Sequence, residues 1–406
     1  MDEIQVDVVD TLILSIIVLF VGNLLTRRVS FLERYSIPQA VTGGIICSLI
    51  VLIIVRSGGP KITFDLRLRD MLLLAFFSTV GLSAKFARLA AGGRLLIILV
   101  ICTGIFLIIQ NTVGIILMTL FGAEPAYGLF AGSISFAGGH GTAIAWGNEL
   151  KDQLPGADVA GIAFATFGLV AGGIIGGPIG ERLIKKNNLQ VRESDGDKPM
   201  MSKKEAVAPS LEPVTMERTL RTVFILAVCI SFGDIVNRFF TESGVKLPGF
   251  LTSMMVGILI TNLADIRKKE IRQYDFDKVG EVALQLFLAM SLMSMDLNAL
   301  AKGINAVLII LFVQVIVITC FAALVIFRLV GKNYDGAVIS AGFTGLGLGA
   351  TPVAIANMNA ITRKHGPSFK AFLVVPLVGA FFVDILNAVI IKFFLGLPMV
   401  QPAAGG

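Results

Sequence analysis

The sequence predicts an all-α integral membrane protein with ten transmembrane helices and two re-entrant hairpins, arranged as an inverted repeat. Three observations predict this fold. The 406-residue chain is 55% hydrophobic and only 15% charged, and apolar runs of about 20 residues, each long enough to cross a bilayer, recur throughout it. Two stretches rich in glycines and hydroxyls interrupt these runs, at about 127–150 and 336–358. The two halves of the chain also align with each other.

Ten apolar runs fall into two sets of five. The first five spans are predicted at about 11–26, 38–55, 70–87, 95–121 and 160–181. The second five are predicted at about 219–238, 247–263, 279–296, 304–328 and 371–394. Residues 185–218 are charged and poor in large apolar side chains, which favours a flexible cytoplasmic linker. The predicted units are therefore an N-terminal repeat at 1–184, this linker, and a C-terminal repeat at 219–406.

Basic residues predict the orientation of the spans. They follow the first, third, fifth and seventh spans and surround the second re-entrant stretch, and include Arg27, Arg28, Lys85, Arg88, Lys185, Lys186, Arg267, Lys268, Arg363 and Lys364. Placing them in the cytoplasm satisfies the positive-inside rule and puts both termini outside. Arg56, Lys61, Arg67 and Arg69, after the second span, are the main exception.

The two re-entrant stretches align with each other. Gly139 pairs with Gly347 at an offset of 208 residues, and the same offset pairs Gly141 with Gly349. With five spans in each half, the second half enters the membrane from the opposite side. We therefore expect the first hairpin to dip in from outside and the second from inside, which is the sequence pattern of a transporter binding site.

Several classes of function fit the sequence poorly. No basic cluster alternates with aromatic residues, so the net charge of +6 does not suggest nucleic-acid binding. The four cysteines all lie in apolar runs without C-x-x-C spacing, which argues against disulfides and metal binding. The chain also lacks a Gly-x-Ser-x-Gly elbow, a P-loop and an H-E-x-x-H motif. We expect no enzyme and no ATP-driven pump, which leaves an ion-driven transporter or a passive channel.

Both glycine-rich stretches can bind ions. Glycines expose backbone N–H groups at half-helix tips, whose partial positive charge favours a carboxylate. Nearby hydroxyl, amide and carbonyl oxygens suit sodium. The predicted substrate-binding residues are Ser135, Gly138, Gly139, His140, Gly141, Thr142, Gly345, Gly347, Gly349, Thr351 and Asp384. The predicted sodium ligands are Thr142, Thr351, Asn357, Asp384 and Asn387. The alternative is that these glycines serve helix packing.

Asp384 is the main charged candidate, because it lies in the middle of a predicted span. An intramembrane carboxylate is costly, so we expect it to balance an ammonium group or a cation; the alternative is a satisfied interhelical hydrogen bond. Asn387, three residues later, shares its helix face. The equivalent stretch of the first half, 171–178, carries no charge, so the predicted site is asymmetric.

Other polar residues receive less specific predictions. Asp234 and Asp296 lie near span ends and are expected to cap helices or face the interface. For His140 a hydrogen-bonded tip residue is favoured over a proton relay. Trp146 and Asn148 either anchor the first hairpin or touch the substrate, and both alternatives stay open.

Three longer motifs resemble those of the bacterial glutamate:sodium symporters: Ser135-Phe-Ala-Gly-Gly-His-Gly-Thr142, Gly347-Leu-Gly-Ala-Thr-Pro-Val-Ala-Ile-Ala-Asn-Met358, and Phe372-Leu-Val-Val-Pro-Leu-Val-Gly-Ala-Phe-Phe-Val-Asp-Ile-Leu-Asn387. The resemblance extends over nearly the whole chain outside the linker. Ala137 departs from it, since serine or glycine is expected there.

The resemblance implies sodium-driven import of L-glutamate across the bacterial inner membrane, with periplasmic termini and sodium as the co-transported ion. It also implies a homodimer with a static scaffold and a moving domain that carries both re-entrant loops, that is, an elevator-type transporter. No organic cofactor and no nucleic acid are expected as partners. The alternatives are a sodium-coupled di- or tricarboxylate carrier and a passive anion channel.

Overall fold

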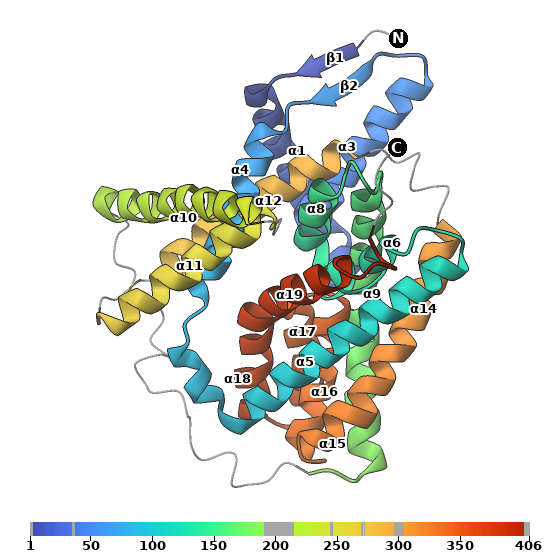
Figure 1. The fold of residues 1–406 in the computed structure, drawn as a ribbon. Helices are drawn as coiled ribbons and strands as arrows, with labels where there is room; N and C mark the ends of the chain where they lie inside the picture. Colours follow the sequence, from blue (N-terminus) through green and yellow to red (C-terminus); the bar gives the residue numbers. More distant parts are fainter. Residues whose placement is uncertain are drawn as a thin grey trace.

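A computed structural model describes residues 3–34, 37–190, 215–243, 247–268, 271, 273–295 and 304–401. These residues are almost entirely helical (Figure 1). The helices of the first half are α1 (Val8–Arg28), α2 (Ser30–Arg34), α3 (Gln39–Arg56), α4 (Arg67–Ser83), α5 (Ala87–Leu120), α6 (Tyr127–Phe130), α7 (Ser133–Phe136), α8 (Gly139–Glu149) and α9 (Ala157–Lys186).

The second half begins with α10 (Met216–Glu242), α11 (Gly249–Ile266) and α12 (Gln273–Met293). It continues with α14 (Ile304–Phe321), the π-helical turn η2 (Ala322–Ile326), α15 (Phe327–Leu329), α16 (Tyr334–Leu348), α17 (Thr351–His365), α18 (Phe369–Leu377), the π-helical turn η3 (Val378–Phe382) and α19 (Val383–Leu395). Most of the predicted linker, 191–214, lies outside the described residues, and its ends belong to α9 and α10.

Eight helical stretches within the described residues are long and apolar enough to cross a membrane, which confirms an integral membrane protein. Every one of the ten predicted spans coincides with helix, and the two that fall short of this criterion are α4 and α12. Helix α4 has only 17 residues. The first nine residues of α12 include Asp275, Asp277, Lys278 and Glu281, so charge in its first turns lowers its hydropathy.

The expectation of an all-α chain is wrong in one detail. Strand β1 (Glu3–Val6) pairs in parallel with β2 (Lys61–Phe64) in a two-stranded sheet. Each strand has only four residues, too few to stand out against apolar runs of helical length. The pairing continues into the next turn, because Asp65 N donates to Val6 O over 3.0 Å. The ribbon therefore joins the start of α1 to the start of α4.

The long helices pack as two groups. Helices α1, α3, α4, α10, α11 and α12 contact one another and form what we call the six-helix group. Helices α5–α9 and α14–α19 form the loop-bearing group. In Figure 1 the six-helix group lies at the left and along the top, and most of the loop-bearing group lies at the lower right. Each group takes members from both halves of the chain.

Helix α16 is the centre of the loop-bearing group, since all of its residues from Tyr334 to Leu348 are buried. Helix α9 packs along α16 and α17 through glycines that recur every four residues, at 168, 172, 176 and 180. A Cβ atom on Gly176 would lie 2.1 Å from Asn357 Nδ2, and one on Gly180 would lie 2.1 Å from Ile361 Cδ1. The glycines thus allow the α9 backbone to approach closely, as in small-residue packing between membrane helices.

Candidate functional site

The two glycine-rich stretches are broken helices in the structure. The first folds as α6, α7 and α8, with a break before α8 at Ala137–Gly138. The second folds as α16 and α17, which together extend beyond the predicted 336–358, with a break at Gly349–Ala350. Each break therefore exposes the N-terminus of a helix of more than ten residues, α8 or α17, where unpaired N–H groups favour an anion.

The two breaks meet. A Cβ atom built on Gly139 would lie 3.5 Å from the carbonyl oxygen of Gly349, although the two residues are 210 positions apart in the sequence. Gly139 has φ +67°, a left-handed conformation that glycine adopts without strain. The structure thus brings the tips of the two glycine-rich stretches together. Next to them, Gly141 faces Phe76 of α4 and Leu284 of α12, at 3.7 and 3.6 Å from a built Cβ.

Other predicted glycines lie in helix packing. A Cβ on Gly345 would meet the backbone nitrogen of Ala354 at 2.7 Å, and one on Gly347 would meet Ile318 Cδ1 at 2.5 Å. A Cβ on Gly138 would meet the side chain of Thr142 at 2.6 Å. At Gly345 and Gly138 the close approach of neighbouring atoms itself requires glycine, whereas at Gly347 the nearest atoms are side-chain ends that would have to shift.

His140 is a hydrogen-bonded residue at the first tip. Its Nε2 lies 2.9 Å from Thr166 Oγ1 on α9. Because the Thr166 hydroxyl donates to Ile162 O over 2.8 Å, Nε2–H of His140 is the donor to Thr166. Ser135 Oγ is buried and has no hydrogen-bond partner among the described residues, which leaves one hydroxyl beside the tip unpaired.

Asn387 holds the first loop in place. Its Nδ2 donates to Ser133 O over 3.0 Å, and Ser133 Oγ donates to Asn387 Oδ1 over 2.5 Å. From the other side, Ser133 N donates to Asn111 Oδ1 over 2.8 Å. All three residues are fully buried. In this structure the amide of Asn387 therefore bonds to the loop rather than facing an open site.

Asp384 lies on a segment that touches both loops. A Cβ on Gly379, in η3, would lie 2.3 Å from Thr351 Oγ1 of the second loop, and Asn387 bonds to Ser133 of the first. Asp384 comes between these two contacts, half-buried in the first turn of α19. It has no hydrogen-bond or ion-pair partner within the described part of the chain. The preceding π-helical turn is a feature often found at functional sites.

Asn357 fastens α17 to α9. Its Nδ2 donates to Gly172 O over 2.9 Å, in the space that Gly176 leaves open. Trp146, at the end of α8, is 1% exposed and packs edge-on against Phe250 of α11, with ring centroids 5.8 Å apart. This contact makes Trp146 an anchor between the loop-bearing group and the six-helix group. Asn148 Nδ2 is buried without a partner among the described residues.

Two buried glutamines were missed from the sequence alone. Gln110 Nε2 donates to Gly347 O over 2.9 Å. Gln314 Nε2 donates to Gln110 O over 2.9 Å and to Ala131 O over 3.0 Å. Both residues are polar positions inside long apolar spans, and this signal could have identified them, as it did for Asp384.

The predictions for the two other acidic residues, Asp234 and Asp296, have different outcomes. Asp234 is exposed and pairs with Arg238 one turn later on α10, as expected for a residue outside the site. Asp296 lies outside the described residues. Within the described chain, no three His, Cys, Asp or Glu residues come together, so a cation near the tips would depend on hydroxyl, amide and carbonyl oxygens with Asp384.

Comparison with known proteins gives one consistent family. The family model described as sodium/glutamate symporter matches residues 4–367. The sodium/glutamate symporters of Escherichia coli (strain K12) and Shigella flexneri are each 42% identical to this chain over 400 residues, covering 97% of this chain and 99% of theirs. The sodium/glutamate symporter of Haemophilus influenzae is 39% identical over 392 residues, covering 94% of this chain and 96% of its own.

Proposed function

The chain belongs to the sodium/glutamate symporter family, and on that premise we propose that it imports L-glutamate together with sodium across the bacterial inner membrane. The observation that carries this proposal is the meeting of Gly139 and Gly349, beside a segment in which Asp384 lies between contacts to both loops. The two helix N-termini suit the two carboxylates of glutamate, and the unpaired carboxylate of Asp384 suits its ammonium group.

In the proposed site, the carboxylates of glutamate lie against the N–H groups at Gly138–Thr142 and Gly349–Thr351. Their negative charge is favoured by the partial positive charge of each helix terminus. Asp384 faces the α-ammonium group or a sodium ion, because a carboxylate without a partner at this depth is otherwise costly. Thr142, Thr351 and Asn357 supply further oxygens for sodium, and Asn387 contributes by holding Ser133.

Sodium supplies the driving force in this proposal. Each charge that enters down the membrane potential contributes about 2.3 kcal/mol per 100 mV. Uphill import of anionic glutamate therefore requires more positive charge to enter as sodium than the substrate carries as negative charge.

We further propose an inverted repeat of ten spans, with α6–α8 and α16–α17 as re-entrant hairpins. The contacts inside the six-helix group support it. A Cβ on Gly44 of α3 would lie 2.4 Å from Leu292 Cβ of α12, and one on Gly81 of α4 would lie 2.1 Å from Met254 O of α11. In these helices the offset between the halves is slightly larger than 208: Gly44 and Met254 are equivalent at an offset of 210 residues, and Gly81 and Leu292 at 211.

The division into two groups supports an elevator-type mechanism. In our proposal the six-helix group is the static scaffold and forms the homodimer, while the loop-bearing group moves with the substrate. The connection from α4 to α5 crosses between the groups. Asn262 holds its start, donating to Ala84 O and accepting from Phe86 N over 2.8 Å each, and Gly93 interrupts the helix with φ +53°. Both termini are periplasmic in this arrangement.

Uptake of labelled L-glutamate into proteoliposomes tests the function. With an inward sodium gradient we expect accumulation that unlabelled glutamate competes and citrate does not, and no accumulation when potassium replaces sodium. Equal flux in both salts would indicate a channel, and sodium-driven uptake of citrate without glutamate would indicate a carrier for other carboxylates. Either result would refute the proposed function.

Asp384→Asn tests the site within the same assay. We expect sodium-driven accumulation to fall at least about tenfold, since a shared intramembrane charge is lost. The matched control is Asp234→Asn, which removes an exposed carboxylate that pairs on the surface of α10 and is expected to transport normally. Equal accumulation by Asp384→Asn and the parent protein would refute the counter-charge role.

A further inference from the structure

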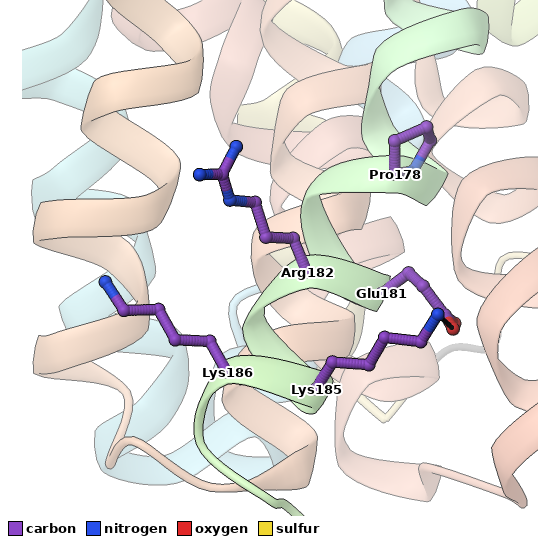
Figure 2. Close-up of a pocket in the computed structure, with 5 residues that line it drawn as sticks. All are labelled: Pro178, Glu181, Arg182, Lys185 and Lys186. Carbon is purple, nitrogen blue, oxygen red and sulfur yellow. Dashed lines mark ion pairs between the residues drawn. The ribbon is translucent and has the colours of Figure 1, made fainter.

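The C-terminal end of α9 carries an open concavity of about 600 Å³. Its lining residues are Pro178, Glu181, Arg182, Lys185 and Lys186 (Figure 2). All five come from the last turns of one helix, and α9 is one of the eight stretches that can cross a membrane. The concavity therefore lies where a membrane-spanning helix ends in basic residues.

The charges in this concavity are not balanced. The single carboxylate, Glu181, is already held by three cationic or imidazole groups: Lys364 Nζ at 2.6 Å, His365 Nε2 at 2.6 Å and Lys185 Nζ at 3.1 Å. Arg182 and Lys186 have no ion-pair partner among the described residues. Figure 2 shows their side chains extending on the same side of α9, away from Glu181. Two adjacent cations are thus available to one anion.

The same helix face turns apolar toward the middle of the span. Pro178 precedes Arg182 by one turn, and Ile174 precedes it by two; both are exposed, Ile174 by 49%. Residues spaced by four share one face of a helix. The face therefore presents, in order, an isoleucine, a proline, an arginine and a lysine. This order matches a molecule with a hydrocarbon chain and an anionic head.

We propose that the end of α9 binds an anionic phospholipid, with the lipid phosphate between Arg182 and Lys186 and an acyl chain along Pro178 and Ile174. The planar guanidinium of Arg182 donates two hydrogen bonds to phosphate oxygens, and Lys186 adds a point charge. A phospholipid is a better occupant than free phosphate because only the lipid also covers the exposed apolar turns. The site does not depend on which substrate the protein carries.

Native mass spectrometry of the full-length protein in detergent, titrated with phosphatidylglycerol or phosphatidylcholine, tests this site. The test variant is Arg182→Gln/Lys186→Gln. The control variant is Arg27→Gln/Arg28→Gln, which removes an exposed basic pair from the last turn of α1. Since each cation near an anionic lipid contributes about fivefold, we expect affinity for phosphatidylglycerol to fall about 25-fold in the test variant, which lacks two cations. The control variant and phosphatidylcholine binding should be unchanged.

Two further arms separate the lipid from free phosphate. Ile174→Asn removes exposed apolar surface without touching a charge and should weaken phosphatidylglycerol binding. Millimolar inorganic phosphate should not displace the lipid. Full retention of phosphatidylglycerol by Arg182→Gln/Lys186→Gln, or an equal loss in the α1 control, would refute the site. Displacement by inorganic phosphate together with unchanged binding in Ile174→Asn would show a phosphate site in place of a lipid site.

Discussion

Gly176→Ala is the most direct test of how the second broken helix, α16–α17, is held against α9. The new Cβ would lie 2.1 Å from Asn357 Nδ2 and 2.8 Å from Ala341 O. Asn357 would have to leave its 2.9 Å hydrogen bond to Gly172 O. Overpacking a tight interior costs about 1–3 kcal/mol, and a buried donor without a partner costs about 1–3 kcal/mol. A shift of the Asn357 side chain would relieve part of the overpacking and part of the unpaired-donor cost. We therefore expect the free energy of unfolding to fall by about 3 kcal/mol.

The adjacent glycine provides the control. A Cβ on Gly177 would have its nearest neighbour, Ala360 Cβ, at 4.0 Å, which is ordinary contact. Both substitutions gain helix propensity of up to about 1 kcal/mol, but Gly177 precedes Pro178, and a Cβ on the residue before proline is disfavoured in a helix. The comparison therefore understates the cost of Gly176→Ala. In detergent, at one scan rate, we expect Gly176→Ala to melt several degrees below Gly177→Ala. Equal melting temperatures would refute the close packing of α9 against Asn357.

Two more predictions concern the first loop. Asn387→Ala and Ser133→Ala should be coupled in a double-mutant cycle of thermal stability, by about 0.5–3 kcal/mol, because both remove the hydrogen bond from Ser133 Oγ to Asn387 Oδ1; additive effects would contradict the contact. Gly139→Ala should strain a left-handed backbone by about 1 kcal/mol and reduce glutamate uptake at normal protein abundance. Gly104→Ala, which meets no atom within 4 Å, should leave uptake unchanged, and an equal effect of both would contradict a special role for the tip.

Much of the fold was predictable because the main sequence signal of a membrane-spanning helix, its hydrophobicity, can be read from one continuous segment of the chain. A run of about 20 apolar residues identifies a span whatever it packs against. The same reasoning fails for short elements: β1 and β2 are stabilised by pairing across 58 residues of chain, and nothing in Glu3–Val6 alone distinguishes a strand. The two groups of helices depend on contacts between halves, which no single span encodes.

The candidate site was predictable to a different degree at each residue. The offset of 208 residues aligned the two glycine-rich stretches, pairing Gly139 with Gly347 and Gly141 with Gly349. The structure brings Gly139 of the first stretch to Gly349 of the second. The offset could not reveal that Gly345 and Gly347 face neighbouring helices, because the facing of a residue depends on how α16 is rotated in its packing. Nor could it reveal that Asn387 bonds to Ser133, since a polar residue within a span predicts a partner but does not identify it.

The candidate site has a carboxylate in only one half, because the side chains at equivalent positions of the two halves have different packing roles. The offset of 208 residues that aligns the glycine tips also aligns Gly176 with Asp384. In the first half, the missing side chain of Gly176 makes room for the Asn357 amide, which binds the α9 backbone at Gly172. In the second half, a side chain is present, and its carboxylate has no partner within the described residues. A carboxylate at position 176 would instead collide with Asn357 and break the contact between α9 and α17. In the proposed inverted repeat, an acidic side chain at this position is therefore compatible with the packing only in the second half.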